Sequence, residues 1–372
     1  MLIGVPREIK SDENRVGLIP SSVRELVHHG HKVLVETHAG YGIGLDDDRY
    51  IAAGAEIAGT AEEVFSKADM IVKVKEPQAA ECKMLREGQI LFTYLHLAPD
   101  LAQTKGLIDS GAIAIAYETV TNARGGLPLL APMSEVAGRM AIQAGAHCLE
   151  KAQGGSGTLL GGVPGVPAGN VVVIGGGVVG TNAARMAMGL EAKVTVIDRS
   201  LERLYELDLQ FGPMLNTIYS TVDAIEENVM AADLVVGAVL VPGAAAPKLV
   251  TDALVSKMQR GSVLVDVAID QGGCFETSRA TTHREPTYMV HDVVHYCVAN
   301  MPGGVARTST FALNNATLPF VLALADKGHR KALADDLHLM QGLNVHRGEI
   351  TYKAVADSHG MAFKTPQEAL GL

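Results

Sequence analysis

Four polar residues end or flank short apolar runs, at predicted strand ends where side chains from both predicted domains can meet a ligand. Arg15 lies in the polar loop after the first run, and Lys75 ends the run MIVKVK. His96 follows ILFTYL, and Asp270 follows VLVDVAI. Arginine grips a carboxylate bidentately, and histidine exchanges a proton near neutral pH. With a lysine beside a carbonyl and a carboxylate to orient water or ammonia, this set suits hydride chemistry on a small amino or oxo acid.

Each of these residues also has a purely structural explanation. Arg15 can be a solvated loop charge, and Lys75 can extend from a strand end into solvent. His96 can belong to a turn, and Asp270 can cap the turn that follows it. The residue types alone leave both explanations open.

A glycine-rich motif carries the strongest signal for a ligand. Gly175, Gly177 and Gly180 form GxGxxG directly after the run VVVI. A predicted helix begins inside the motif, at Val178. The glycines permit a tight turn, close approach of backbone N–H groups to a pyrophosphate, and close packing of helix on strand. The helix N-terminus then favours the phosphate charge. Asp198 ends the next apolar run, which is the context that a dinucleotide site requires.

Asp198 also bears on which dinucleotide is bound. A carboxylate at this place accepts hydrogen bonds from the ribose hydroxyls and repels a 2′-phosphate, which predicts NAD rather than NADP. Arg199 and Arg203 argue the other way, because guanidinium groups bind 2′-phosphates. The structural alternative is that Asp198 caps a helix that starts at Leu201.

Apolar runs alternate with amphipathic segments in the first 130 residues. We predict strands at 2–5, 32–36, 70–74, 90–94 and 112–116, and helices at 21–29, 60–68 and 100–110. Thr60 with Glu63 predicts a capping box. The runs are apolar on both faces, as in a parallel sheet covered by helices on both sides.

A second alternation follows a helix predicted at 134–152 and a Gly/Pro-rich stretch at 154–170. We predict strands at 171–174, 193–197, 234–238 and 262–267, and helices at 178–190, 201–211, 223–232 and 251–260. The tail from Arg307 is predicted to be helical, at 312–327 and 331–341, and to pack on the first domain. The fold class is therefore α/β with two doubly wound parallel-sheet domains: a Rossmann domain at 134–305, inserted into a discontinuous domain of 1–133 and 306–372.

Composition narrows the class of protein. The chain has 372 residues, enough for about two domains, and is 48% hydrophobic. A formal net charge of −10 argues against nucleic-acid binding. The four cysteines are scattered, no signal peptide or membrane span is readable, and we expect a cytoplasmic protein. His291 and His295 would share one face of a helix, but no third ligand is evident, and we predict no metal site.

Several segments together resemble one enzyme family. IGVPREIKSDENRVGLIP, VKVKEP, TYLHLAPD, LLAPMSEVAGRMA and NMPGGVARTST are similar in order and spacing to alanine dehydrogenase, of the alanine dehydrogenase and pyridine nucleotide transhydrogenase α-subunit family. The resemblance covers essentially the whole chain. It implies NAD-dependent, reversible oxidative deamination of L-alanine to pyruvate and ammonium, and a homohexamer.

The resemblance also implies roles for individual residues. Arg15 and Lys75 bind the substrate, His96 transfers the proton, and Asp270 is its catalytic partner near the nicotinamide. The positions that contact NAD, beside the glycines, are Ser134, Asp198, Arg203, Ser220, Val239, Leu240, Val267, Ala268, Ile269, Asp270, Arg279, Val298, Ala299, Asn300 and Met301.

Two alternatives remain. The nucleotide-binding component of a proton-translocating transhydrogenase would need membrane helices or a membrane partner. A non-catalytic NAD-binding regulator would tolerate the loss of His96 and Asp270, and both are present.

Overall fold

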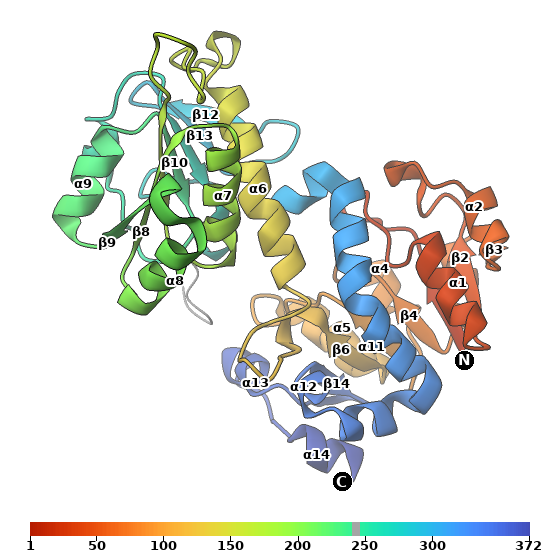
Figure 1. Cartoon of the computed structure of the whole chain (residues 1–372). Helices are drawn as coiled ribbons and strands as arrows, with labels where there is room; N and C mark the ends of the chain where they lie inside the picture. Colours follow the sequence, from red (N-terminus) through yellow and green to blue (C-terminus); the bar gives the residue numbers. More distant parts are fainter. Residues whose placement is uncertain (240–245) are drawn as a thin grey trace. The chain divides into compact units, whose positions relative to one another are not determined.

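The computed structural model describes residues 1–239 and 246–372 (Figure 1). They form two compact units. Unit 1 comprises Met1–Met133 and Ala306–Leu372, and unit 2 comprises Ser134–Val305. Each unit is built on one sheet.

The sheet of unit 1 has eight strands in the order β15-β14-β6-β5-β4-β1-β2-β3. Their bounds are β1 Leu2–Val5, β2 Lys32–Glu36, β3 Glu56–Ala58, β4 Met70–Val72, β5 Ile90–Thr93, β6 Ile113–Ala116, β14 Leu343–His346 and β15 Glu349–Ile350. The first six run parallel, with Ile3 of β1 opposite both Val33 and Met70. Strand order changes direction between β1 and β4, and ligands of open α/β sheets bind at such a point.

The helices of unit 1 mostly begin where a side chain caps them. They are α1 Pro20–His28, α2 Asp47–Ala52, α3 Ala61–Lys67, α4 Ala79–Cys82, α5 Leu101–Ser110, α11 Ala306–Asp335, α12 Leu337–Met340, α13 Lys353–His359 and α14 Pro366–Leu370. The hydroxyl of Thr60 accepts from the N–H of Glu63, as predicted. The Glu63 carboxylate, however, accepts from Gly59 N–H, one residue before the position that a capping box requires.

The prediction of an all-helical tail is wrong for residues 343–350. Strand β14 pairs antiparallel with β6, and β15 returns against β14. Arg347 and Gly348 join them with φ of 49° and 89°, which is the left-handed pair that a tight hairpin turn requires. The two strands are short, and in so short a run helix and strand look alike.

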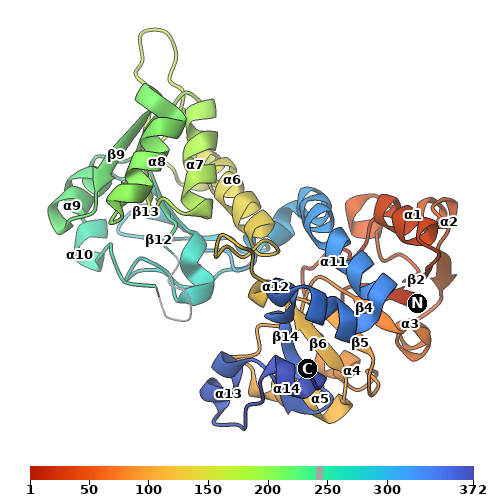
Figure 2. The ribbon, with the colours of Figure 1, turned by 60° about the horizontal axis from the view of Figure 1, so that its bottom comes forward.

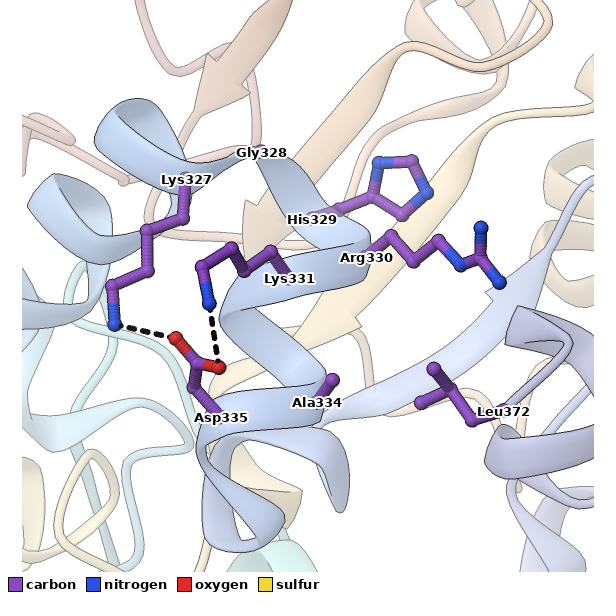
Figure 3. Close-up of a pocket in the computed structure, with 8 residues that line it drawn as sticks. All are labelled: Lys327, Gly328, His329, Arg330, Lys331, Ala334, Asp335 and Leu372. Atoms are coloured by element: carbon purple, nitrogen blue, oxygen red, sulfur yellow. Dashed lines mark hydrogen bonds and ion pairs between the residues drawn. The ribbon is translucent and has the colours of Figure 1, made fainter.

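A kink at Gly328 divides α11, where φ is 73° and ψ is 157°. The sequence predicts two helices separated here, but the first begins earlier than predicted, at Ala306. A pocket of about 460 Å³ lies around the kink (Figure 3). Lys327 and Lys331 converge on Asp335 at 2.9 and 3.0 Å, and Arg330 donates to Gly371 O near the C-terminus. None of the predicted site residues lines this pocket.

His329 beside the kink makes acid sensitivity a testable property. Its ring lies 5.7 Å from that of His346, and burial, reinforced by His346, Arg347 and Arg330, lowers its pKa to about 4. The unfolded chain takes up this proton near pH 6.5, so the group removes stability as the pH falls from 6.5 towards 4. After allowance for solvent screening, we expect His329→Gln to cut the stability lost between about pH 7 and 4.5 by about 1 kcal/mol.

Urea unfolding at the two pH values measures this change, and His147→Gln, at an exposed histidine of unit 2, is the control. An unchanged pH dependence in His329→Gln would contradict the assignment.

The sheet of unit 2 has seven strands in the order β12-β13-β11-β10-β7-β8-β9. Their bounds are β7 Asn170–Ile174, β8 Lys193–Asp198, β9 Leu215–Tyr219, β10 Leu234–Gly237, β11 Val263–Asp266, β12 Thr287–Val290 and β13 Val293–Tyr296. All pair in parallel except β12, so the predicted fold class is confirmed, with parallel pairing dominant in both sheets. Alternate residues of β7 enter two core clusters, Val171 and Val173 in one and Val172 and Ile174 in the other. Both faces of this strand are therefore buried.

The helices of unit 2 are α6 Ala131–Cys148, α7 Val178–Gly189, α8 Leu201–Phe211, α9 Val222–Met230 and α10 Asp252–Val255. Helix α6 starts three residues earlier than predicted, and its first residues lie before the unit boundary. Helices α6 and α7 lie side by side (Figures 1 and 2), where a Cβ at Gly138 would lie 2.2 Å from Val179 O. Helix α10 is shorter than predicted, because after Val255 the chain continues in turns, with Lys257 N–H bonded to Leu254 O. Within the described ranges, no helix is both long and apolar enough to span a bilayer.

Candidate functional site

Three of the four predicted chemical residues lie at one edge of the sheet in unit 1. Strands β1, β4 and β5 are neighbours and parallel, so their carboxyl ends point the same way. Arg15 follows β1, Lys75 follows β4 and His96 follows β5. The fourth residue, Asp270, lies in unit 2, after β11. As predicted, Arg15 lies in the loop after its strand, and the other three residues lie within a few positions of a strand end.

Arg15 is buried, with its guanidinium held by the carboxylate of Glu13. Nε and Nη2 donate to the two Glu13 oxygens at 2.7 and 2.6 Å, and the backbone N–H of Arg15 also donates to Glu13. Nη1 lies 3.1 Å from the sulfur of Met133, a weak acceptor. The carboxylate outweighs the cost of burial and raises the pKa of Arg15, so the group stays charged. The solvated-loop explanation of Arg15 is therefore wrong.

A buried ion cluster fixes the carboxyl end of β4. The ammonium of Lys73 is fully buried and lies 3.1 Å from Glu8 and 2.7 Å from Glu81. Glu8 also accepts from the N–H of Val74 at 2.7 Å, and Tyr117 donates its hydroxyl to Lys73 O. The backbone just before Lys75 is thus fixed by two side chains, Glu8 at the N–H of Val74 and Tyr117 at the carbonyl of Lys73.

Lys75 itself is largely buried. Burial lowers the pKa of its ammonium, Glu76 opposes that effect, and the charge of Arg15 adds to it. Arg15 and Lys75 follow the neighbouring parallel strands β1 and β4, so two positive groups lie at the same edge of the sheet. Such a pair attracts a small anion.

His96 is held in an unusual backbone conformation. Its φ is 50°, which is uncommon for a residue other than glycine, and its N–H donates to Glu118 at 2.6 Å. Nδ1 of the ring lies 3.9 Å from the same carboxylate, and the ring stacks on Tyr94 at 5.8 Å. The side chain is 47% exposed, so it can reach a ligand from outside the core.

Sequence reasoning missed the partners of these residues, although some left a signal. Lys73 is a charge inside the apolar run MIVKVK, and a buried charge requires a counter-charge. Glu118 follows β6, the strand next to β5, in the same way that His96 follows β5. Glu13, two residues before Arg15, carries no periodic signal.

In unit 2 the glycine motif spans the end of β7 and the start of α7. Gly175 has φ of 103°, and a Cβ there would lie 2.7 Å from Ala238 O. A Cβ at Gly180 would lie 1.8 Å from Gly175 O, so helix and strand approach closely. Gly177 caps α7, and a Cβ there would meet no atom of the described residues within 4 Å. Because β7 lies where strand order reverses, this glycine-rich turn sits at the switch point of the sheet.

Asp198 and Arg203 bind the backbone of Gly176, which lies between the first two glycines of the motif. Asp198 accepts from Gly176 N–H at 2.6 Å and from Ser200 N–H at 2.8 Å. Arg203 donates Nε to Gly176 O at 2.6 Å and pairs with Glu206. Ser200, not Asp198, supplies the side-chain cap of α8, so the capping explanation of Asp198 is wrong.

The other predicted cofactor positions in the described part of unit 2 gather mainly at the carboxyl ends of its parallel strands. They are Ser220 after β9, Val239 after β10, Val267, Ala268, Ile269 and Asp270 after β11, and Val298, Ala299, Asn300 and Met301 after β13. Ser134 lies in α6 and Arg279 before β12, while Leu240 lies outside the described residues. One edge of the sheet thus carries most of the predicted set.

The loop after β11 forms a short 3₁₀ helix, Val267–Gln271, that carries Asp270 at the surface. Asp266 begins it and accepts from Ala268 N–H, so Asp270 is within the turn and does not cap it. Among the residues that the structure describes, the buried side-chain oxygen of Gln271 has no hydrogen-bond partner. An unsatisfied acceptor next to Asp270 and an open face over Gly177 both fit a bound pyridine nucleotide.

Replacing Gly177 tests where the dinucleotide lies. The backbone there has φ of −67°, and within the described ranges a Cβ meets no atom closer than 4 Å, so Gly177→Ala should fold normally. A pyrophosphate against the turn would meet the added methyl group, and we expect NADH to bind about tenfold more weakly or worse.

Fluorescence titration with NADH measures this affinity. Gly189→Ala, at the end of α7 with equal space around its Cβ, is the matched control. Equal NADH affinity in Gly177→Ala and Gly189→Ala would exclude a pyrophosphate at this turn.

The two histidines set aside from the sequence do not share a helix. His291 and Asp292 form the hairpin turn before β13, with φ of 49° and 60°, and His291 pairs with Asp252. His295 lies in β13, fully buried, bonded to Thr277 and stacked on Tyr288. Across the residues that the structure describes, no three His, Cys, Asp or Glu side chains are placed to hold a metal ion.

Known proteins match the whole chain. Residues 4–137 match the family described as "Alanine dehydrogenase/PNT, N-terminal domain", and residues 141–353 match the corresponding C-terminal domain. "Alanine dehydrogenase" of Halomonas elongata is 62% identical, and that of Methanococcus maripaludis 55%, each over 100% of both chains.

Solved structures agree with these matches. A chain titled "L-alanine dehydrogenase" is 53% identical with a TM-score of 0.94, and the match covers 97% of this chain and 99% of that one. A transhydrogenase from Sinorhizobium meliloti is 25% identical with a TM-score of 0.82, covering 95% and 100%. The resemblance found in the sequence is confirmed, and the chain belongs to the alanine dehydrogenase/PNT family.

Proposed function

We propose that this chain catalyses the reversible reaction L-alanine + NAD⁺ + H₂O → pyruvate + NH₄⁺ + NADH + H⁺. The observation that carries the proposal is that Arg15, Lys75 and His96 all follow neighbouring parallel strands at one carboxyl edge, in a chain similar over its full length to alanine dehydrogenases. The relatives at 55–62% identity bear that name, whereas the transhydrogenase is 25% identical.

The substrate carboxylate is proposed to bind Arg15 and Lys75. Glu13 binds the Nε–Nη2 edge of the guanidinium, and we assign the substrate carboxylate to the Nη1 side, next to the thioether of Met133. A carboxylate is a much stronger acceptor than a thioether sulfur. Glu13 thus aims the guanidinium while Lys75 adds a second charge.

His96 is proposed to accept the proton of the water that adds to the oxidised substrate. It is exposed, its backbone is fixed by Glu118, and its ring is stacked on Tyr94. Asp270, in the turn after β11, is proposed as the second catalytic residue. In the reverse direction the same imidazolium returns the proton to the departing hydroxyl.

The pyridine nucleotide supplies the hydride acceptor, and the proposal assigns it the carboxyl edge of unit 2. Gly175, Gly177 and Gly180 would receive the pyrophosphate, and Asp198 the adenosine ribose. NAD is proposed over NADP, because Asp198 repels a 2′-phosphate and Arg203 is already bonded to Gly176 and Glu206. The homohexamer and the cytoplasmic location stay predictions that follow from the resemblance and the composition.

NADH formation from L-alanine and NAD⁺, followed by absorbance, tests the proposal. We expect turnover with L-alanine, much less with D-alanine and L-lysine, and a preference for NAD⁺ over NADP⁺. L-Serine measures how strictly the site excludes a side chain one atom larger. NADH binding without turnover would favour a regulator, and the proposed activity would be wrong.

A further inference from the structure

Asp266 is a buried carboxylate that organises the loop after β11. It is fully buried, and one oxygen accepts from Ala268 N–H at 3.1 Å. The other accepts from Cys274 N–H at 2.8 Å, from Phe275 N–H at 3.4 Å and from the hydroxyl of Ser278. One side chain thus binds the start and the end of the segment 267–278.

Two glycines make room for this carboxylate. A Cβ at Gly273 would lie 2.5 Å from one Asp266 oxygen, and a Cβ at Gly237 of β10 would lie 3.2 Å from the other. Gly273 also has φ of 79°, which favours glycine. The backbone is therefore shaped around the carboxylate.

Lys248 binds the same segment through its carbonyl groups. Its ammonium donates to Gly272 O, to Gly273 O at 3.0 Å and to Phe275 O at 3.1 Å. The N–H groups of the loop thus face an anion, and its carbonyls face a cation. Both arrangements strengthen hydrogen bonds, because each has a charged partner.

The segment so held links two residues of the proposed function. Asp270 stands near its start, and Arg279 follows its end. Arg279 donates its N–H to the hydroxyl of Tyr288 at 2.8 Å, and its guanidinium lies 4.1 Å from the centre of that ring. Tyr288 in turn donates to Thr277 O. Neither Asp266 nor Lys248 belongs to the predicted ligand contacts, yet both bind the chain between these two.

We propose that Asp266 and Lys248 are positioning residues that hold the segment 267–279, and with it Asp270 and Arg279, in the geometry that binds the pyridine nucleotide and serves the reaction. The inference rests on the proposed function of Asp270 and Arg279. Asp266 binds N–H groups of the segment from the protein interior, and Lys248 binds its carbonyl groups.

Lys248→Met tests the proposal, because Lys248 is exposed and its replacement leaves the core intact. We expect kcat to fall about tenfold or more and NADH to bind more weakly, since small misplacement of reacting groups is costly. The loss of three hydrogen bonds should lower the melting temperature only slightly, because they lie in one surface segment. Lys248→Arg keeps a cationic donor and should restore most of the activity. Lys257→Met, at an exposed lysine of the same unit, is the control.

Asp266→Asn supplies the second measurement. The amide keeps one acceptor and turns a donor towards Cys274 and Phe275 N–H, so its NADH affinity should fall at least as far as that of Lys248→Met. Ser278→Ala, which removes one donor and keeps the carboxylate, should fall less.

The outcomes separate this inference from the proposed activity. Lys248→Met with kcat and NADH affinity within about twofold of wild type, or with a lowered melting temperature as its only change, overturns the positioning role. Wild-type protein that binds NADH but does not oxidise L-alanine overturns the proposed activity instead. In that case the effect of Lys248→Met on NADH affinity still tests the positioning role, because NADH binding is measured without turnover.

Discussion

His96→Ala is expected to lower kcat by about 10²–10⁴-fold while NADH affinity stays within about twofold of wild type. The proposed proton transfer is lost with the imidazole, whereas the glycine motif and Asp198 belong to a different unit. Steady-state turnover and NADH fluorescence titration measure the two effects separately.

His96→Asn separates the loss of the imidazole from backbone strain. His96 has φ of 50°, and asparagine tolerates this region better than alanine. Both variants should therefore lose similar activity, and His147→Ala, at an exposed histidine of unit 2, should lose none. Near-normal turnover in His96→Asn would remove His96 from the mechanism.

Lys73→Met is expected to lower the free energy of unfolding by about 3–5 kcal/mol. The ammonium lies fully buried between Glu8 and Glu81, and its removal leaves two buried carboxylates without their counter-charge. Urea unfolding of wild type and variant at equal ionic strength measures the loss.

The pH dependence of that loss identifies its cause. Burial already raises the pKa of Glu8 in the wild type, and without Lys73 it rises further. The folded variant then holds protons that the unfolded chain has released above about pH 4.5, so its stability falls as the pH rises. Lys73→Met combined with Glu8→Gln and Glu81→Gln should recover much of the stability. A Lys73→Met protein as stable as wild type would contradict an ion cluster at this place.

Elements that depend on a single short stretch of sequence were predicted best. The apolar runs ending in Lys75 and Asp270 predicted strands with polar residues at their carboxyl ends, and the structure has these strands. The glycine motif was similarly local, because turn, helix start and next strand all lie within 30 residues of one another. A β-hairpin at 343–350 was missed, since its pairing with β6 joins segments that are far apart in the chain.

The partners of the site residues were missed for the same physical reason. Glu118 lies 22 residues from His96, and Glu8 lies 65 residues from Lys73. Only the strand order brings them together, and no local pattern encodes it. Asp266 did interrupt the apolar run VLVDVAI, but its four donors are spread over the following 12 residues.

A crystal structure with NADH and pyruvate bound is the most direct test of the account. We predict the pyruvate carboxylate on Arg15 and Lys75 with His96 beside the oxo group, and the pyrophosphate at Gly175–Gly180. The nicotinamide carbon that carries the hydride should then lie about 3–3.5 Å from the oxo carbon. Pyruvate bound away from Arg15 and His96, or NADH bound away from the glycine motif, would contradict the account.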